Sequence, residues 1–187
     1  MSKTSAGESP FTYGVHPGVA RVQKWISDLR AKTGRTLDEW VELVTQSGPP
    51  TEKARREWLK AKYNLGTNSA WWIAERAGGT GLENFDDPEE YLRAAELYVR
   101  EQYSGPKEKL RPIYDILLKI GKSLGSDVKA CPCRTIVPLY RNHVFAQIKP
   151  AANTRVDLGL ALAKHRGKFP RRLVGTGGLA KKDRITH

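Results

Sequence analysis

The chain has 187 residues, of which 39% are hydrophobic and 28% charged, and its formal net charge is +12. This balance is typical of a soluble globular protein with one sizeable core or two small ones. No apolar run approaches the roughly 20 residues of a membrane-spanning helix, and the N-terminus lacks the apolar centre of a secretory signal. Two cysteines are too few for a disulfide framework. We therefore expect a cytoplasmic protein that does not associate with a membrane.

The charge is unevenly distributed along the chain. Residues 1–103 contain 14 Lys and Arg against 15 Asp and Glu, a net charge of −1, whereas residues 104–187 contain 18 against 5, a net charge of +13. All five tryptophans lie in the first of these parts. The two compositions predict two modules with separate cores.

Residues 15–81 are predicted to form a small all-helical module whose helices are separated by glycine and proline. Thr36 and Glu39 have the spacing of a capping box, in which each side chain accepts a hydrogen bond from the backbone amide of the other residue. Further helices are expected to begin at Thr51 and at Thr67 or the next residue, which would supply the N-cap.

The third and fourth predicted helices, joined through Asn64 to Thr67, have the length and glycine turn of a helix-turn-helix. The module is nearly neutral, however, and its would-be reading helix carries Trp71, Trp72 and Ile73, which suit a core better than base edges. We therefore favour a packed helical hairpin over DNA reading.

A connecting helix is predicted over residues 86–103, because an aspartate N-cap precedes Pro88 at the first helical position. After a break at Ser104–Pro106, residues 104–187 are predicted to form a basic module. It begins with a helix, and from Val128 onward apolar residues alternate with a period of two. The fold class is thus α+β, with a small N-terminal all-helical module followed by a helix packed on an antiparallel β-meander.

The only two cysteines fall at the start of this alternation. One face of an extended segment would carry Cys131, Cys133, Thr135, Val137 and Leu139. A turn at Arg141-Asn142 would pair Val137 with Ala146 and Leu139 with Val144. Because the cysteines share the apolar face, we predict that they are small buried residues. A redox pair and a metal site are the alternatives, although a C-x-C motif alone is a weak signal for either.

The opposite face of the sheet is the candidate site, because it would combine cations with aromatic rings as platforms for single-stranded nucleic acid do. A basic Gly- and Pro-containing segment follows the last strand and would attract phosphates. The alternatives are a helix that covers this face and a solvated basic loop. The candidate residues are Arg134, Tyr140, Phe145, Gln147, Lys149 and Arg155 on the sheet, and Lys164, Arg166, Lys168, Arg171 and Arg172 in the following segment.

No G-x-S-x-G, H-E-x-x-H or G-x-G-x-x-G motif occurs in the sequence. We therefore expect a non-enzymatic binding protein without catalytic residues, resident metal or cofactor, and leave its oligomeric state open. An enzyme acting on a phosphorylated or nucleotide substrate would instead need an enclosed pocket with convergent polar groups such as His143, Arg155 and Asp157.

Several segments resemble known families. YGVHP, TGRTLDEW, TEKARREWLK and LGTNSAWWIAERA resemble the bacterial domain of unknown function 4287. LRPIYDILL, CPCRTIVPLYRNHVFAQIKP, TRVDLGLAL and TGGLAKKDRITH resemble domain of unknown function 5655, which often follows it. The resemblance implies no established activity and no catalytic or binding residues.

The helix-then-meander plan is more loosely similar to small α+β proteins that include a proposed frataxin-like iron chaperone. This similarity implies a small-ligand or iron carrier as the alternative function, although a module with a net charge of +13 offers few carboxylates to a hard cation. Proteins that resemble this chain continue past the DRITH segment with the rest of a strand and a closing helix. We therefore expect an apolar face that is either uncovered or filled by a partner.

Overall fold

The computed structural model describes residues 12–79, 85–162, 171 and 173. The chain divides into two compact units. The helical unit comprises residues 17–91, and the α+β unit combines the N-terminal residues up to His16 with residues 92–187. The α+β fold class, with helices first and strands last, is confirmed.

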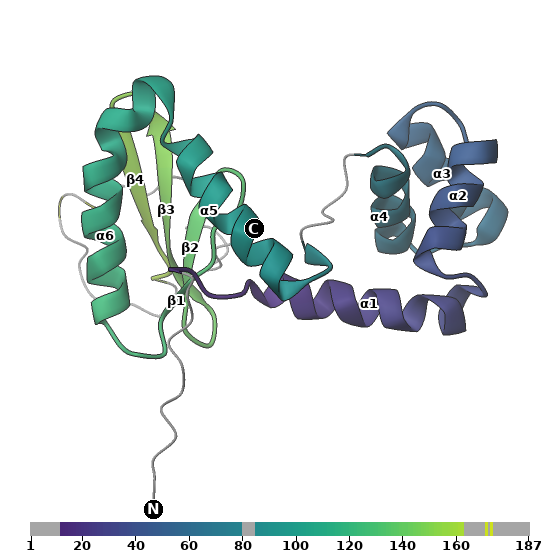
Figure 1. The fold of residues 1–187 in the computed structure, drawn as a ribbon, viewed down its shortest axis with the longest axis horizontal. Coiled ribbons are helices and arrows are strands. Elements are labelled where there is room, and N and C mark those ends of the chain that lie inside the picture. The colour runs from purple at the N-terminus through teal and green to yellow at the C-terminus, as the bar shows by residue number, and fades with distance from the viewer. Residues whose placement is uncertain (1–11, 80–84, 163–170, 172, 174–187) are drawn as a thin grey trace, which may run out of the picture. The chain divides into compact units, whose positions relative to one another are not determined.

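The helical unit contains four helices before the connecting helix (Figure 1). The predicted capping box is confirmed, since the Thr36 amide donates to Glu39 Oε2 over 2.7 Å and the Glu39 amide to Thr36 Oγ1 over 3.3 Å. The predicted cap of the fourth helix is wrong, because its N-cap is Gly66 and no side chain bonds the helix start there. The four helices are α1 (Pro17–Thr33), α2 (Leu37–Ser47), α3 (Glu52–Tyr63) and α4 (Thr67–Ala77).

Helix α4 packs against α2 and α3 with its small and branched residues. Ala70, Ile73 and Ala74 are fully buried in the core of this unit. Trp71, expected in the core, is instead 39% exposed, because it lies on the side of the helix away from these residues. Trp25 connects α1 to α4 by a hydrogen bond, since its Nε1 donates to Ser69 Oγ over 3.0 Å. Helices α3 and α4 therefore form a packed hairpin.

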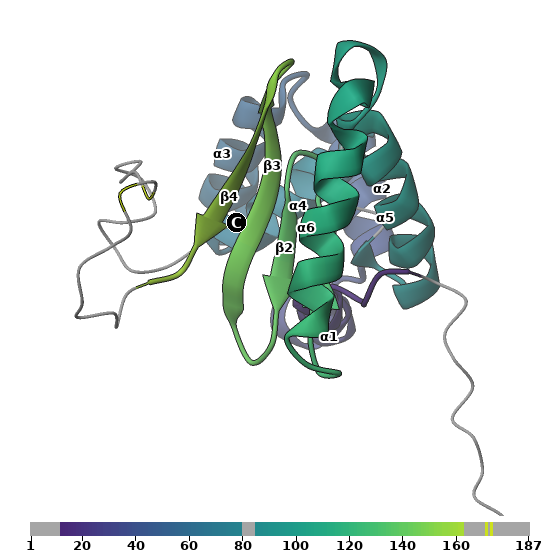
Figure 2. The ribbon, with the colours of Figure 1, turned by 90° about the vertical axis from the view of Figure 1, so that its left-hand side faces the viewer.

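The connecting helix α5 (Pro88–Gln102) begins as predicted, because Asp87 Oδ1 accepts hydrogen bonds from the amides of Glu89 and Glu90. A short 3-10 helix, η2 (Gly105–Leu110), and the amphipathic helix α6 (Arg111–Ser123) follow it. Helix α6 and the C-terminal part of α5 lie on the same side of the sheet (Figure 2).

Within the described residues the sheet has four antiparallel strands in the order β1-β2-β3-β4. The predicted strand through the cysteines is wrong in one respect. The Cys133 amide donates to Ile136 O over 2.8 Å, so the chain turns back at Arg134-Thr135 and divides into two short strands. Side-chain alternation cannot reveal such a reversal, and Thr135 is consequently exposed. The strands are β1 (Lys129–Ala130), β2 (Val137–Tyr140), β3 (Val144–Ala152) and β4 (Arg155–Leu160).

The predicted register between β2 and β3 is also wrong. Val137 pairs with Ile148 and Leu139 with Ala146, two residues away from the expected partners, and a bulge follows Leu139. Because the shift is an even number of residues, the same side chains still face the helices. Val137, Leu139, Ala146 and Ile148 are all buried on that face.

Helix α6 approaches β2 closely at Gly121, where an added Cβ atom would clash with Leu139 Cδ1. Leu139 is itself fully buried and cannot move aside freely. We expect Gly121→Val to lower the free energy of unfolding by roughly 2–3 kcal/mol, measured by urea unfolding followed by far-UV circular dichroism. The matched control Lys119→Val places the same residue at an exposed position of the same helix and should change stability far less. Equal effects of the two substitutions would contradict this packing.

Candidate functional site

Residues 12–16 cover the β1 edge of the sheet. The Gly14 amide donates to Ala130 O over 2.9 Å, which fixes the segment against β1. His16 Nε2 then lies 3.1 Å from Tyr140 Oη, and the two rings meet edge to face with centroids 5.5 Å apart. Tyr140 is only 9% exposed as a result. The prediction that Tyr140 offers an open stacking surface is therefore wrong, because a segment more than 120 residues earlier in the chain packs on it.

The central strand carries the remaining candidate residues of the outer face. Phe145, Gln147 and Lys149 alternate with the buried Ala146 and Ile148 along β3 and thus point away from the helices. Phe145 and Gln147 are half-buried, whereas Lys149 is exposed.

Strand β4 extends this face beside β3. Gln147 is paired with Gly159, and a Cβ atom at Gly159 would come within 3.0 Å of Gln147 Cγ, so the amide side chain lies across the glycine. Gln147 Oε1 is buried and has no hydrogen-bond partner among the residues that the structure describes. Lys149 is paired with Asp157, whose carboxylate binds Arg155 Nε over 2.7 Å.

Three of the predicted cations gather at one end of the sheet. Arg134 lies on the turn between β1 and β2 rather than within a strand, and it is exposed. This turn precedes Val137, the partner of Ile148, and therefore lies at the end where Lys149 and Arg155 are found. Of the predicted residues beyond β4, Arg171 is exposed. The others, Lys164, Arg166, Lys168 and Arg172, lie outside the described residues.

Most of the carboxylates of the basic module form ion pairs with arginine side chains. Within the described part of residues 104–187, the ion pairs are Arg111 with Asp115, Arg141 with Asp127 and Arg155 with Asp157. In the same part of the chain Arg134, Lys149 and Lys119 make no ion pair. Among the described residues, Arg134 on the turn and Lys149 on the outer face therefore remain as cations that no carboxylate neutralises.

The cysteines are both free thiols, and their predicted burial is confirmed for Cys131, while Cys133 is half-buried. Cys131 Sγ lies 3.6 Å from Val15 O. Burial raises the pKa of Cys131 to about 12 and that of Cys133 to about 11. Both thiols are protonated at neutral pH, which makes them poor nucleophiles and poor metal ligands. No group of three His, Cys, Asp or Glu side chains suited to a metal ion occurs among the described residues.

His143 is not close to Arg155 and Asp157, the residues named with it as an alternative polar site. His143 lies in the hairpin between β2 and β3, whereas Asp157 pairs with Lys149. Six residues of strand separate Lys149 from His143, or about 20 Å at 3.3 Å per residue. Arg155 and Asp157 therefore form an ion pair at the far end of the sheet from His143.

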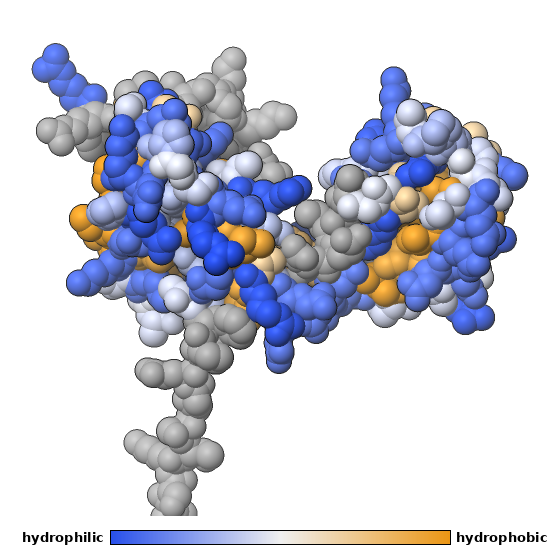
Figure 3. Space-filling model, turned by 45° about the horizontal axis from the view of Figure 1, so that its top comes forward, coloured by the Kyte–Doolittle hydropathy of each residue, from blue (hydrophilic) through white to orange (hydrophobic). Residues whose placement is uncertain are grey.

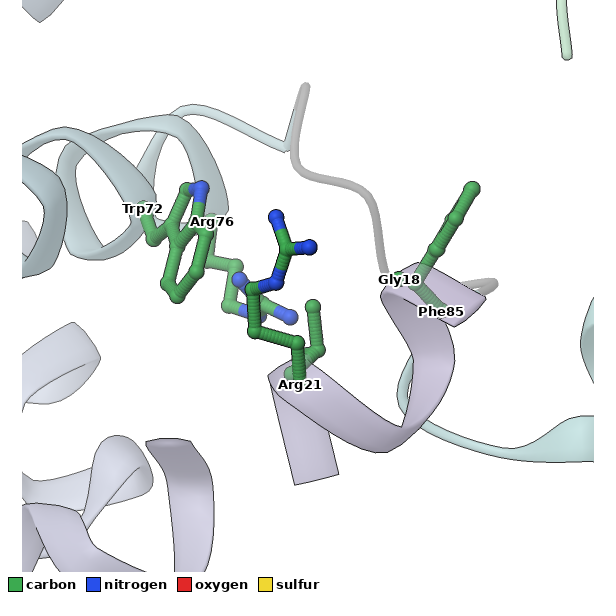
Figure 4. Close-up of a pocket in the computed structure, with 6 residues that line it drawn as sticks. Gly18, Arg21, Trp72, Arg76 and Phe85 are labelled. Carbon is green, nitrogen blue, oxygen red and sulfur yellow. The ribbon is translucent and has the colours of Figure 1, made fainter. Parts of the chain in front are cut away.

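The helical unit contains a small hollow that no sequence pattern indicated (Figure 4). Its volume of about 110 Å³ is well below the roughly 300–1,000 Å³ of typical ligand sites. The Arg76 guanidinium lies beside it, paired with Asp86 and 5.4 Å from the centroid of the Trp25 ring. The lining residues are Gly18, Arg21, Val22, Trp72, Arg76 and Phe85.

Comparison with protein families agrees with this architecture. Residues 21–77 match the family described as Domain of unknown function (DUF4287), and residues 99–187 match Domain of unknown function (DUF5655). The two matches occur in the order that the sequence segments predicted. No curated protein and no solved structure matches the chain. Among the described helices, none is both long enough and apolar enough to cross a membrane.

The raised thiol pKa values lead to a prediction about reactivity. At pH 8 the folded protein should react with iodoacetamide roughly 100-fold more slowly than the same chain in urea, because only the thiolate attacks. The unfolded chain releases these protons above about pH 8.5 while the folded thiols keep them, so the free energy of unfolding should fall as the pH rises from there towards 11. Rapid labelling of Cys131 in the folded protein would contradict the assigned burial.

The contact between His16 and Tyr140 leads to a second prediction. Tyr140→Phe should lower the free energy of unfolding by about 1 kcal/mol, the usual net contribution of one hydrogen bond. In the His16→Leu background, Tyr140→Phe should lower the free energy of unfolding much less, because the hydrogen-bond partner is already absent. Urea unfolding of the wild type, both single variants and the double variant measures this coupling. An equal cost of Tyr140→Phe in both backgrounds would show that the hydroxyl acts elsewhere.

Proposed function

We propose that the α+β unit binds a polyanion, with single-stranded nucleic acid as the first candidate. We define the basic face as the outer-face residues Phe145, Gln147 and Lys149 together with Arg134 and Arg155. The observation that carries the proposal is that Arg134 and Lys149 have no carboxylate partner among the described residues and lie at one end of a face that also holds an aromatic ring.

The sequence that follows β4 supports this proposal by its composition. Residues 163–187 contain eight Lys and Arg against one Asp. This segment follows the last strand in the sequence, so its charge adds to the positive charge of the α+β unit. Each phosphate that such cations neutralise releases bound counterions, which makes binding favourable and strongly dependent on salt.

The burial of Tyr140 changes the expected mode of binding. Among the described residues of the predicted set, Phe145 is the aromatic residue that stays partly accessible, whereas Tyr140 is buried. Stacking typically contributes about 1–3 kcal/mol per base, so a single ring gives limited affinity. We therefore propose that electrostatic attraction dominates and that sequence selectivity is low.

We also propose a cytoplasmic location. Both cysteines are free thiols, which suits a reducing compartment.

Fluorescence anisotropy with a labelled single-stranded oligonucleotide at two salt concentrations tests the proposal. The double variant Arg134→Ala/Lys149→Ala should bind roughly tenfold more weakly at low salt and reduce the slope of log K against log salt by about 1.4, twice the 0.7 expected per phosphate contact on single strands. The control Lys109→Ala/Lys119→Ala removes the same charge from exposed positions on η2 and α6. Equal losses in the two double variants, or wild-type binding no tighter than that of a neutral protein of similar size, would overturn the proposal.

A further inference from the structure

Six large apolar side chains remain exposed on one side of the α+β unit. Four belong to α6 or follow it directly, and two belong to β4. Every one of them is at least 40% exposed, which is far from the near-complete burial of the residues that form the core. They are Ile113 (46%), Ile116 (60%), Ile120 (55%), Leu124 (59%), Leu158 (43%) and Leu160 (40%).

Helix α6 therefore has two apolar faces. Tyr114, Leu118 and Gly121 form the buried face that packs on the sheet. The exposed residues recur every three or four positions from Ile113 to Leu124, which defines a second stripe about 100° further around the helix. We call Ile113, Ile116, Ile120 and Leu124 the α6 stripe.

The contacts of the N-terminal segment locate the α6 stripe. Lys122 Nζ donates to Thr12 O over 3.1 Å, and Tyr13 Oη lies 3.0 Å from Tyr114 Oη, so the segment packs along the other flank of α6. The same segment is bonded to β1 through Gly14. Since β1 and β4 are opposite edges of the sheet, the stripe faces the β4 side. Figure 3 shows apolar surface along the left-hand edge of the α+β unit.

Strand β4 contributes two further apolar side chains beside the α6 stripe. Leu158 pairs with Ile148 and Leu160 with Ala146, so both leucines point to the helix side of the sheet. The Ala161 amide donates to Phe145 O over 2.9 Å. In an antiparallel ladder the peptide groups alternate in direction, so the amides of Leu158 and Leu160 point away from β3 towards the free edge. Among the described strands, β4 is the last of the sheet.

We propose that this surface binds a second copy of the chain. Two β4 edges pair in antiparallel fashion about a twofold axis perpendicular to the sheet, which is the arrangement that satisfies the outward amides of both copies. The axis keeps both α6 helices on the same side of the continuous sheet. Each α6 stripe then faces the other stripe across the seam, above Leu158 and Leu160 of both copies.

The exposed area is appropriate for such an interface. The six side chains together expose on the order of 500 Å² per copy, near the upper end of the largest apolar patch on a typical monomer, about 300–600 Å². A standard interface buries roughly 800 Å² per partner, and the β4 backbone and flanking side chains add the difference. The basic face lies on the opposite side of the sheet and stays open, so self-association does not depend on the proposed function.

Sedimentation equilibrium of the full chain, treated with nuclease and measured in high salt, tests the proposal. The wild type should have twice the chain mass of 20.9 kDa, because apolar association persists in high salt whereas nucleic-acid bridging does not. Ile116→Glu/Ile120→Glu should weaken association at least 100-fold while leaving the circular dichroism spectrum unchanged, since both side chains are already more than half exposed. The control Lys119→Glu, on the polar flank of the same helix, should retain the dimer.

Amide hydrogen exchange of β4 shows whether a second copy or the chain's own residues cover the β4 edge. The Leu158 and Leu160 amides should be protected to an extent that rises with protein concentration, and this protection should disappear in Ile116→Glu/Ile120→Glu. A monomer in which these amides are protected at every concentration would mean that the chain's own residues cover the edge, and it would overturn the proposal. A monomer without such protection, or a dimer that survives the double substitution, would overturn it as well.

Discussion

The α+β unit depends on the way in which residues 12–16 are held at the β1 edge of its sheet. Gly14 bonds the backbone of β1, Tyr13 reaches Tyr114 on the helix side, and His16 reaches Tyr140 on the other side. The segment thus closes one edge and contacts both faces. Its position decides which aromatic rings remain accessible and which flank of α6 remains uncovered.

Closing one edge makes the sheet asymmetric. The β1 side is covered by residues from the N-terminal end of the chain, whereas β4 keeps outward-pointing amides beside exposed leucines. The two faces also differ in chemistry, because α6 and α5 lie on the apolar face while Lys149 and Arg155 lie on the other. A polyanion and a second copy of the chain would therefore use different surfaces, and each could bind without displacing the other.

The buried polar groups of this unit serve its structure. Desolvation raises the pKa of Tyr103 and Tyr114 well above the ordinary value for a phenol, as it does for Cys131. Gln102 Nε2 donates to Cys133 O over 2.7 Å and so fixes the turn that holds the thiols. Because these groups are neutral and enclosed at physiological pH, the chemistry open to a partner is on the surface.

The sequence by itself determined the features that depend on neighbouring residues. The Thr36 capping box, the aspartate cap of α5, the change from helical to strand periodicity and the inward direction of Ala146 and Ile148 all follow from local spacing. Only the tertiary structure decided the burial of Tyr140, the turn at Arg134, the β2–β3 register and the uncovered stripe on α6. The physical reason is that periodicity reports which side chains share a face, whereas a contact between His16 and Tyr140, or the absence of one at Ile116, depends on segments far apart in the chain.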